Sequence, residues 1–513
     1  MVSIYLSISM SALAYSAPLL IPTYAWWCVF LFSAPLYLLP YLKKPTFSDG
    51  LLWGILVFSC TLSGVFMGAL YNTHSTLDSA ISAILAIMIA ISLILYFSLY
   101  SALWFWLTGE LIQVSMAIYS ISTTDTVSIK KLVYSNTSYH MLLISIPMWL
   151  ATTLLYIFCI DNYSLWPFLR LEGHPLMHPL IPLATHPKLL RLLPLLGKNM
   201  LTFLVLLPAA ALALGLTHYI KNCRRSHQVR KHYYLQDSHI YYIFFLLTLA
   251  SWTGSYLVPQ RTRPLPDWLA YISWLPLQGS GHETVAYIAQ NQFKKIITTK
   301  PSTRLIIVPE SAFYSDTLCS TDSCMQLWHA NYLTQPISII CGSFSRETTH
   351  KSCKTSNPIN QTVHEKNKSY LFNTCYLVYN GSLFQEFHKT HTVPFTEQMP
   401  LWLTYPTLNS LFFTDFPAIT PSTNKRMPFM VPGVHTFIPY ICSELFFSHY
   451  PDSNTKKTPI LALVNDAWTH NNYLCTLMLR TAQLKAIEWQ CDILYISYAY
   501  GVSIDKNGIC HTI

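Results

Sequence analysis

The sequence predicts a multi-pass α-helical membrane domain followed by an α/β domain. Of its 513 residues, 52% are hydrophobic and 14% aromatic, while only 11% are charged. Ordinary soluble domains carry about 25% charged residues. The apolar residues gather before residue 260 in stretches long enough to cross a bilayer. After residue 283, short apolar runs alternate with segments of helical periodicity, which is the pattern of layered α/β domains.

The charge distribution excludes several classes of protein. The formal net charge is +9, with 13 basic and 7 acidic side chains in residues 1–258 and 19 and 16 in residues 259–513. Neither half has a dense basic face, so we expect no nucleic-acid partner. The high apolar content also excludes intrinsic disorder, and the length excludes a small disulfide-stapled secreted fold.

Seven stretches in the first half have the roughly 20 mostly apolar residues that a transmembrane helix needs. They are Ile4–Ile21, Tyr24–Leu42, Leu51–Tyr71, Ser79–Leu107, His140–Ile160, Met200–Ile220 and Ile240–Val258. The first has no basic n-region and no clear small-residue cleavage site, so we interpret it as a retained span and not as a signal peptide. Residues 1–258 are therefore assigned to a membrane domain.

Basic residues between the spans predict the orientation in the membrane. They follow spans 2, 4 and 6 at Lys43, Lys44, Lys130, Lys131, Lys221, Arg224, Arg225, Arg230 and Lys231. Basic loops stay in the cytoplasm, so an odd number of spans places the second domain outside. The connection between spans 5 and 6 is also basic, and we expect it at the headgroups of the membrane surface. In a bacterium this predicts an inner-membrane protein whose second domain lies in the periplasm.

Residues 259–282 are a connector rich in Pro and Trp, and residues 283–513 form the predicted α/β domain. Apolar runs predict strands at Arg304–Val308, Pro336–Gly342, Cys375–Tyr379, Thr436–Ile441, Ile460–Val464 and Ile493–Ser497. Helical spacing predicts helices over Thr284–Ile297 and Thr476–Glu488. Asn380-Gly381 predicts a hairpin turn, and the polar residues 343–370 predict an exposed insertion.

Three side chains that suit acyl transfer follow predicted strands. Glu310 follows the first strand, Lys389 the strand after the hairpin turn, and Cys442 the run Thr436–Ile441. A carboxylate can take the thiol proton, an ammonium can stabilise an oxyanion, and a thiolate can attack a carbonyl. The second half contains nine cysteines, so in an oxidising compartment at least one thiol is unpaired or serves chemistry. The alternative interpretation is a solvated glutamate, a surface lysine and a core cysteine.

Four segments resemble motifs of a known family. They are Leu305–Ser311, His388–Glu397, Ile441–Glu444 and Asn465–Trp468. In this order they are similar to motifs of the nitrilase-like (carbon–nitrogen hydrolase) superfamily and, within it, of the apolipoprotein N-acyltransferases. Seven spans ahead of an outer domain also match the layout of that family. The resemblance implies that the second domain is an α-β-β-α sandwich.

The resemblance also implies roles for individual residues. Glu310 matches the general base, Lys389 the oxyanion-stabilising lysine and Cys442 the nucleophile. Glu397 matches the glutamate that helps to position the lysine, and Glu444 matches the acidic residue two positions after the nucleophile. These five residues are the expected catalytic and supporting set.

The implied reaction transfers an acyl chain from a phospholipid to Cys442 as a thioester. The N-terminal amine of a diacylglyceryl-modified apolipoprotein then takes the chain, with Trp468 lining the acyl-chain side of the cleft. The resemblance thus implies a lipid bilayer, a phospholipid donor and an apolipoprotein acceptor as partners of a monomer. It implies no metal and no organic cofactor.

The sequence departs from the family at several points. Ser443 replaces a tyrosine beside the nucleophile, and Thr396 replaces the glycine before Glu397. The family continues beyond the position of Gly508 with further strands and a last span, so we expect the sheet to be incomplete at Ile513. Two alternatives stay open. One is a membrane-bound nitrilase-like amidase or an acyltransferase of another substrate class, and the other is a non-catalytic scaffold.

Overall fold

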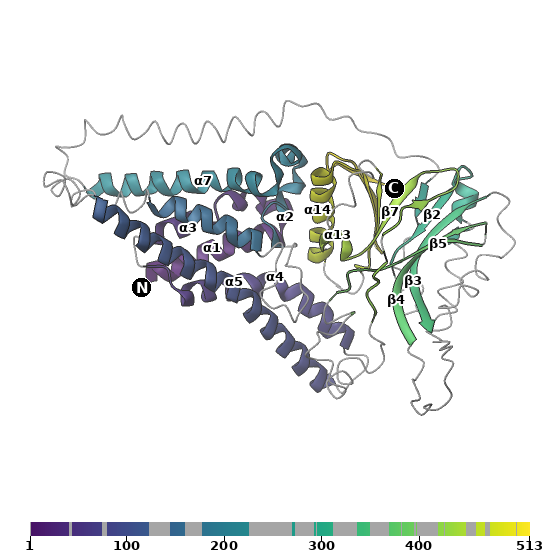
Figure 1. Cartoon of the computed structure of the whole chain (residues 1–513), viewed down its shortest axis with the longest axis horizontal. Helices are drawn as coiled ribbons and strands as arrows, with labels where there is room; N and C mark the ends of the chain where they lie inside the picture. Colours follow the sequence, from purple (N-terminus) through teal and green to yellow (C-terminus); the bar gives the residue numbers. More distant parts are fainter. Residues whose placement is uncertain are drawn as a thin grey trace, which may run out of the picture. The chain divides into compact units, whose positions relative to one another are not determined.

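A computed structural model gives the fold of most of the chain (Figure 1). It describes residues 2–39, 44–73, 79–122, 144–159, 177–224, 269–271, 292–293, 295–310, 336–348, 369–380, 382–393, 397, 419–424, 426–447, 458–466, 472–498 and 500–513. The chain divides into two compact units. The first comprises residues 1–165, 171–261 and 468–488, and the second comprises residues 166–170, 262–467 and 489–513.

The described secondary structure of the first unit is helical. Its elements in chain order are α1 (Val2–Leu20), α2 (Pro22–Ala25), η1 (Trp26–Phe30), α3 (Ala34–Leu38), α4 (Phe47–Thr73), α5 (Ser79–Ser122), a helix at Ile144–Cys159, η5 (Pro182–Thr185), η6 (Pro187–Leu190), α7 (Leu193–Arg224) and α14 (Asn472–Trp489). Helix α7 is kinked at Gly197, whose φ of 73° is not helical.

Two helices among the described residues are long and apolar enough to cross a membrane, at Ala90–Tyr119 and Leu193–Ala213. Four shorter apolar helices cover Ile4–Leu20, Trp27–Tyr37, Phe47–Leu62 and Ile144–Cys159. The predicted span Ile240–Val258 lies outside the described residues. The multi-pass membrane domain and its orientation therefore stay predictions.

Helices α4 and α5 pack closely at two glycines. A Cβ atom on Gly54 would lie 2.7 Å from Ser98 Cα, and one on Gly50 would meet the Ser101 carbonyl oxygen. Small residues four positions apart let two helix backbones approach each other, which is a common way for apolar helices to associate in membranes. This surface of α4 has no room for a larger side chain.

The second unit contains two β-sheets. The first has the order β1-β2-β3-β4-β5 and the second the order β11-β10-β9-β8-β7-β6. The strands of the first sheet are β1 (Leu269–Tyr271), β2 (Leu305–Val308), β3 (Ser338–Thr348), β4 (Ser369–Tyr379) and β5 (Ser382–His388). Those of the second are β6 (Phe429–Met430), β7 (Thr436–Ile441), β8 (Ile460–Leu463), β9 (Ile493–Ile496), β10 (Gly501–Ile504) and β11 (Cys510–Thr512), and the short helix α13 (Glu444–Phe447) follows β7.

Three neighbouring strands are parallel in each sheet, at one side of the first sheet and in the middle of the second. Strands β1, β2 and β3 are parallel in the first sheet, and β7, β8 and β9 are parallel in the second. All residues of β2, β8 and β9 are buried. Strands covered on both faces are continuous apolar runs, which is why their sequences predicted them well. Strand β7 has the predicted bounds, and β2, β8 and β9 each differ from the prediction by one residue.

The prediction of an exposed insertion at residues 343–370 is wrong at both ends. Strands β3 and β4 pair antiparallel over 11 positions, from Ser338 opposite Tyr379 to Thr348 opposite Ser369. Ser345 is buried in this pairing, and its hydroxyl lies 2.9 Å from the Thr374 hydroxyl. Polar side chains that form hydrogen bonds with each other across two strands do not produce an apolar run. The hydropathy pattern therefore did not indicate a strand here. Residues 349–368 lie outside the described part of the chain.

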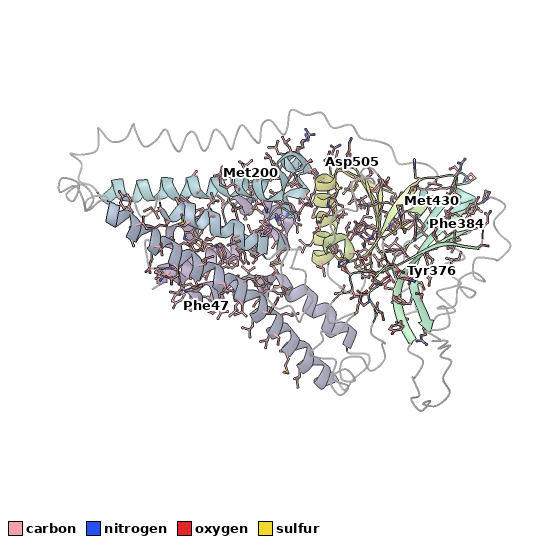
Figure 2. The ribbon with its side chains drawn as sticks, in the orientation of Figure 1. Phe47, Met200, Tyr376, Phe384, Met430 and Asp505 are labelled. Carbon is pink, nitrogen blue, oxygen red and sulfur yellow. The ribbon has the colours of Figure 1, made fainter. Side chains whose placement is uncertain are left out.

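The two sheets contact each other within this unit. A Cβ atom on Gly501 of β10 would lie 2.8 Å from the ring of Tyr271 on β1. At the opposite edges, the Gln385 side chain of β5 accepts from Met430 N at 2.7 Å and donates to the Pro428 carbonyl oxygen at 3.3 Å. Phe384 and Met430 are exposed beside this junction (Figure 2). Strand β1 falls within the predicted connector 259–282, and the predicted domain boundaries stay untested.

Candidate active site

Three strand ends bring the predicted catalytic groups together in the second unit. Glu310 follows β2, Lys389 follows β5 and Cys442 follows β7. Their exposed fractions are 3%, 1% and 6%. Two of these strands belong to the first sheet and one to the second, so the site forms where the two sheets meet. The alternative of a solvated glutamate and a surface lysine does not match these positions, whereas Cys442 is a core cysteine as that alternative expected.

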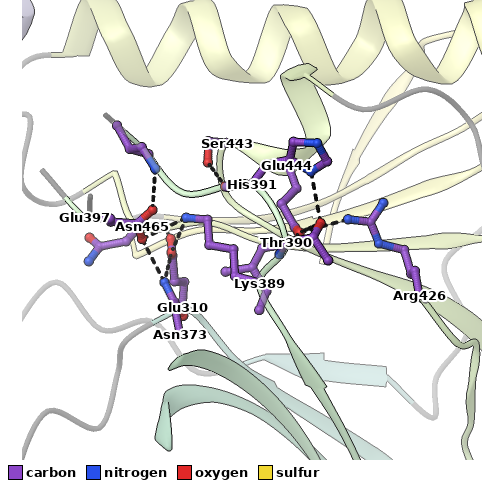
Figure 3. Close-up of polar contacts among 12 residues, drawn as sticks. Glu310, Asn373, Lys389, Thr390, His391, Glu397, Arg426, Ser443, Glu444 and Asn465 are labelled. Carbon is purple, nitrogen blue, oxygen red and sulfur yellow. Dashed lines mark hydrogen bonds and ion pairs between the residues drawn. The ribbon is translucent and has the colours of Figure 1, made fainter. Parts of the chain in front are cut away.

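The Lys389 ammonium lies between two carboxylates (Figure 3). Its Nζ is 3.2 Å from Glu310 Oε1 and 2.9 Å from Glu397 Oε1. Asn373 of β4 donates from Nδ2 to the same two oxygens, at 2.7 Å to Glu310 and 3.0 Å to Glu397. A buried charge needs partners of this kind, because each unpaired ion in an apolar interior costs several kcal/mol. One ammonium and one amide thus hold both carboxylates in place.

Backbone amides fix the other oxygens of these carboxylates. Asn465 N donates to Glu310 Oε2 at 2.9 Å, and Val393 N donates to Glu397 Oε2 at 2.7 Å. Asn465 lies just after β8 of the second sheet, whereas Glu310 follows β2 of the first. The Glu310 carboxylate is therefore bound to both sheets. The motif Asn-Asp-Ala-Trp therefore supplies a backbone donor through its first residue.

Cys442 occupies a strained turn between β7 and α13. Its φ is 46°, in the left-handed region that residues other than glycine rarely adopt. The Cys442 amide donates to the Leu463 carbonyl oxygen at 2.8 Å, which continues the parallel pairing of β7 with β8. The Glu310 carboxylate is close enough to raise the pKa of the thiol. A nucleophile held beside a base in such a turn is typical of enzymes that form covalent intermediates.

Glu444 connects the lysine loop to the nucleophile turn. Its Oε1 accepts from Thr390 N and Thr390 Oγ1, both at 2.6 Å, and its Oε2 accepts from Ile441 N at 2.9 Å. Ser443 Oγ donates to the His391 carbonyl oxygen at 3.1 Å. The serine that replaces the expected tyrosine therefore makes a second bridge between the same two segments.

Burial and neighbouring charges set the protonation states. Burial raises the pKa of Glu310, against the opposing effects of the Lys389 ammonium and the hydrogen bonds from Asn373 and Cys442. Burial also raises the pKa of the Cys442 thiol well above its ordinary value, and the Glu310 charge adds to this effect. For Lys389, burial lowers the pKa, but Glu310 and Glu397 together raise it above its usual range. The resting site thus holds a neutral thiol beside an ammonium and its carboxylates.

Two site residues were missed by the sequence interpretation. Asn373 lies in the middle of β4, and Arg426 pairs with Glu444 at 2.9 Å. Neither belongs to one of the four motifs, and no local pattern marks them. Trp468, the predicted residue on the acyl-chain side, lies outside the described residues, and its role stays a prediction. Among the described residues, no group of three or more His, Cys, Asp and Glu side chains could hold a metal ion.

Comparison with known proteins supports the resemblance. No family model matches the chain. An apolipoprotein N-acyltransferase of Haemophilus influenzae is 30% identical over 199 residues, which are 38% of this chain and 35% of that protein. The chain thus matches about a third of the length of this curated relative.

Two solved structures are also similar. A carbon–nitrogen hydrolase from Helicobacter pylori has a TM-score of 0.30 at 12% identity, over 45% of this chain and 80% of that one. Nit3 of Saccharomyces cerevisiae, a member of branch 10 of the nitrilase superfamily, has a TM-score of 0.29 at 14% identity, over 45% and 79%. TM-scores this low carry no weight for the function, which depends on the sequence relative and on the site. Over little more than a third of its length, the chain is similar to an apolipoprotein N-acyltransferase.

Proposed function

We propose that the chain is a membrane-bound N-acyltransferase. It moves an acyl chain from a phospholipid, through a thioester on Cys442, to the N-terminal amine of a diacylglyceryl-modified cysteine in apolipoproteins. The observation that carries this proposal is the buried arrangement of Cys442, Glu310 and Lys389 at three strand ends. The similarity to an apolipoprotein N-acyltransferase supports the choice of substrates.

In the first half-reaction, the Cys442 sulfur attacks the ester carbonyl of the phospholipid. Because the thiol is neutral at rest, Glu310 accepts its proton as the carbon–sulfur bond forms. The Lys389 ammonium faces the developing oxyanion and stabilises it, as preorganised charge does in acyl transfer. The intermediate collapses to the thioester, and Glu310 returns the proton to the alkoxide of the departing lysophospholipid.

In the second half-reaction, the free amine of the acceptor attacks the thioester. Glu310 takes a proton from the attacking nitrogen, and Lys389 again stabilises the oxyanion. The carbon–sulfur bond breaks, the amide is released, and the thiolate recovers its proton from Glu310. Both substrates are lipid-anchored, so we propose that the protein works in the bacterial inner membrane with this unit on the periplasmic side. No step of this scheme needs a metal or an organic cofactor.

The first test is a trap for the acyl-enzyme. Purified protein in detergent is incubated with a phospholipid that carries a tagged acyl chain, and hydroxylamine-sensitive label is located by mass spectrometry. We expect label on Cys442 and none in the Cys442→Ala variant. Cys491→Ala is the matched control, because Cys491 is also buried but follows α14, outside the segments that carry Glu310, Lys389 and Cys442. This control should keep its label.

The second test adds the acceptor. A diacylglyceryl-cysteine peptide with a free amine should take the label from Cys442, whereas the same peptide with an acetylated amine should not. Label that is lost to water at the same rate with either peptide would indicate a hydrolase. If folded protein takes no label from phospholipid, the acyltransferase proposal is wrong, and an amidase or a non-catalytic scaffold replaces it.

A further inference from the structure

Arg426 is a partly buried cation beside the site that none of the motifs includes. Its guanidinium lies 2.9 Å from Glu444 Oε1 and 3.8 Å above the centre of the Tyr440 ring. The Phe387 ring is 5.2 Å from the same group. The side chain of Arg426 is only 12% exposed, so these contacts are largely shielded from water. A cation stacked on aromatic rings and paired with a carboxylate is held in one orientation.

The two aromatic partners of Arg426 come from different sheets. Phe387 lies on β5, two residues before Lys389, and Tyr440 lies on β7, two residues before Cys442. Each ring therefore lies on the strand that leads to a catalytic group. Strand β5 belongs to the first sheet and β7 to the second. Arg426 therefore contacts both strands two residues before their catalytic groups.

The ion pair with Glu444 completes this link. Glu444 follows Cys442 by two residues. Its carboxylate accepts hydrogen bonds from the backbone amide and the hydroxyl of Thr390, the neighbour of Lys389. The chain just before Arg426 contacts the same loop, because Ser422 N donates to the Lys389 carbonyl oxygen at 2.9 Å. Without the guanidinium, the Glu444 carboxylate would keep its hydrogen bonds but lose its counter-charge (Figure 3).

We propose that Arg426 is a positioning residue that sets the separation of Lys389 from Cys442 across the two sheets. This inference rests on the proposed function, in which the two groups act on one carbonyl. Arg426 itself touches no reacting atom. Without Arg426, Lys389 should stabilise the oxyanion less well, so acylation of Cys442 should slow. Reactions of the thiol that form no oxyanion, such as alkylation, should keep their rate.

Two probes separate these effects. Acylation of Cys442 is followed as the burst of p-nitrophenolate from p-nitrophenyl butyrate, with Cys442→Ala as the blank. Alkylation of Cys442 by iodoacetamide is followed by mass spectrometry, and this displacement forms no oxyanion. The ratio of the two rates reports the contribution of Lys389. An unfolded chain would be alkylated faster, because its Cys442 thiol is no longer buried. Both rates are therefore measured on the folded fraction isolated by gel filtration.

The Arg426→Met variant should lose about 100-fold in acylation, the cost of misplacing a reacting group by about 1 Å. Its rate of alkylation should stay close to that of the wild type. Combining Arg426→Met with Lys389→Met should add little to the loss from Lys389→Met alone, because the arginine acts through the lysine. The control Arg304→Met removes an exposed arginine of the same unit and should change neither rate.

Equal losses of acylation and alkylation in folded Arg426→Met would overturn the inference, as would additive losses in the double variant. If Arg426→Met does not fold, Arg426→Lys decides, because lysine keeps the charge but has no planar face to stack. We expect an intermediate loss of acylation, and wild-type acylation would overturn the inference. In another outcome, Arg426→Met loses acylation by p-nitrophenyl butyrate but not alkylation, while phospholipid leaves no label on Cys442 of the wild type. That result would reject phospholipid as the donor and leave this inference standing. Acylation by neither ester would reject both.

Discussion

Lys389 has the least contact with solvent of the three catalytic candidates, and both of its close partners are acidic. Replacing it with methionine removes the charge that we propose stabilises the oxyanion. We expect Lys389→Met to slow thioester formation by about 10²–10³ in single-turnover measurements. The companion variant Lys389→Met/Glu397→Gln relieves the repulsion left between the two carboxylates and should be equally slow. A loss below about tenfold in the companion would remove Lys389 from the oxyanion role.

The protonation of Glu310 gives a second prediction at the residue scale. As the base, Glu310 must be ionised, and burial raises its pKa. Thioester formation should therefore fall as the pH is lowered through that raised pKa, at a higher pH than the value of about 4.3 for an ordinary glutamate. Asn373→Leu removes a hydrogen bond that lowers the pKa of Glu310, so its acid limb should move to still higher pH. A rate that stays constant down to the ordinary value would argue against Glu310 as the base.

At the scale of elements, the close contact between β1 and β10 can be tested. Gly501→Ala places a methyl group against the Tyr271 ring, and overpacking of this kind costs about 1–3 kcal/mol. The variant should therefore unfold at a lower denaturant concentration than the wild type. Replacing Tyr271 with leucine in the same chain should recover part of the loss. If Gly501→Ala is as stable as the wild type, the two sheets do not meet at this point.

The sequence predicted strands β2, β8 and β9 better than β3 and β4 for a physical reason. Strands β2, β8 and β9 are buried on both faces, so their residues form apolar runs with visible ends. Strands β3 and β4 extend through polar residues such as Ser345 and Thr374, which satisfy each other in the sheet. No local signal distinguishes such a strand from an exposed loop.

The same distinction applies to the site. Glu310, Lys389 and Cys442 could be assigned because each follows a strand within a recognisable motif. Asn373 and Arg426 could not, because their partners lie 63 and 18 positions away in the sequence. The sequence does not show whether an Arg or Asn is shielded from water. Only the folded chain shows the carboxylates that it contacts.

At the scale of the whole molecule, the proposed orientation makes a prediction about labelling. Cys510 on β11 is exposed and belongs to the second unit. If that unit is periplasmic, a membrane-impermeant maleimide should modify Cys510 in intact cells, as detected by peptide mass spectrometry. The Cys510→Ser variant identifies the labelled site. Modification only after the inner membrane is permeabilised would place this unit in the cytoplasm and reverse the orientation predicted from the loop charges.

The turn at Cys442 implies a trade-off between activity and stability. With a φ of 46°, the backbone there would be more relaxed with glycine than with any residue that has a side chain. Cys442→Gly should therefore be more stable than Cys442→Ala by about 1 kcal/mol, although neither can form a thioester. Equal denaturation midpoints for the two variants would mean that the turn is not strained. A stabler chain lies within reach of one substitution, so the fold does not account for a thiol at this position, whereas the proposed reaction does.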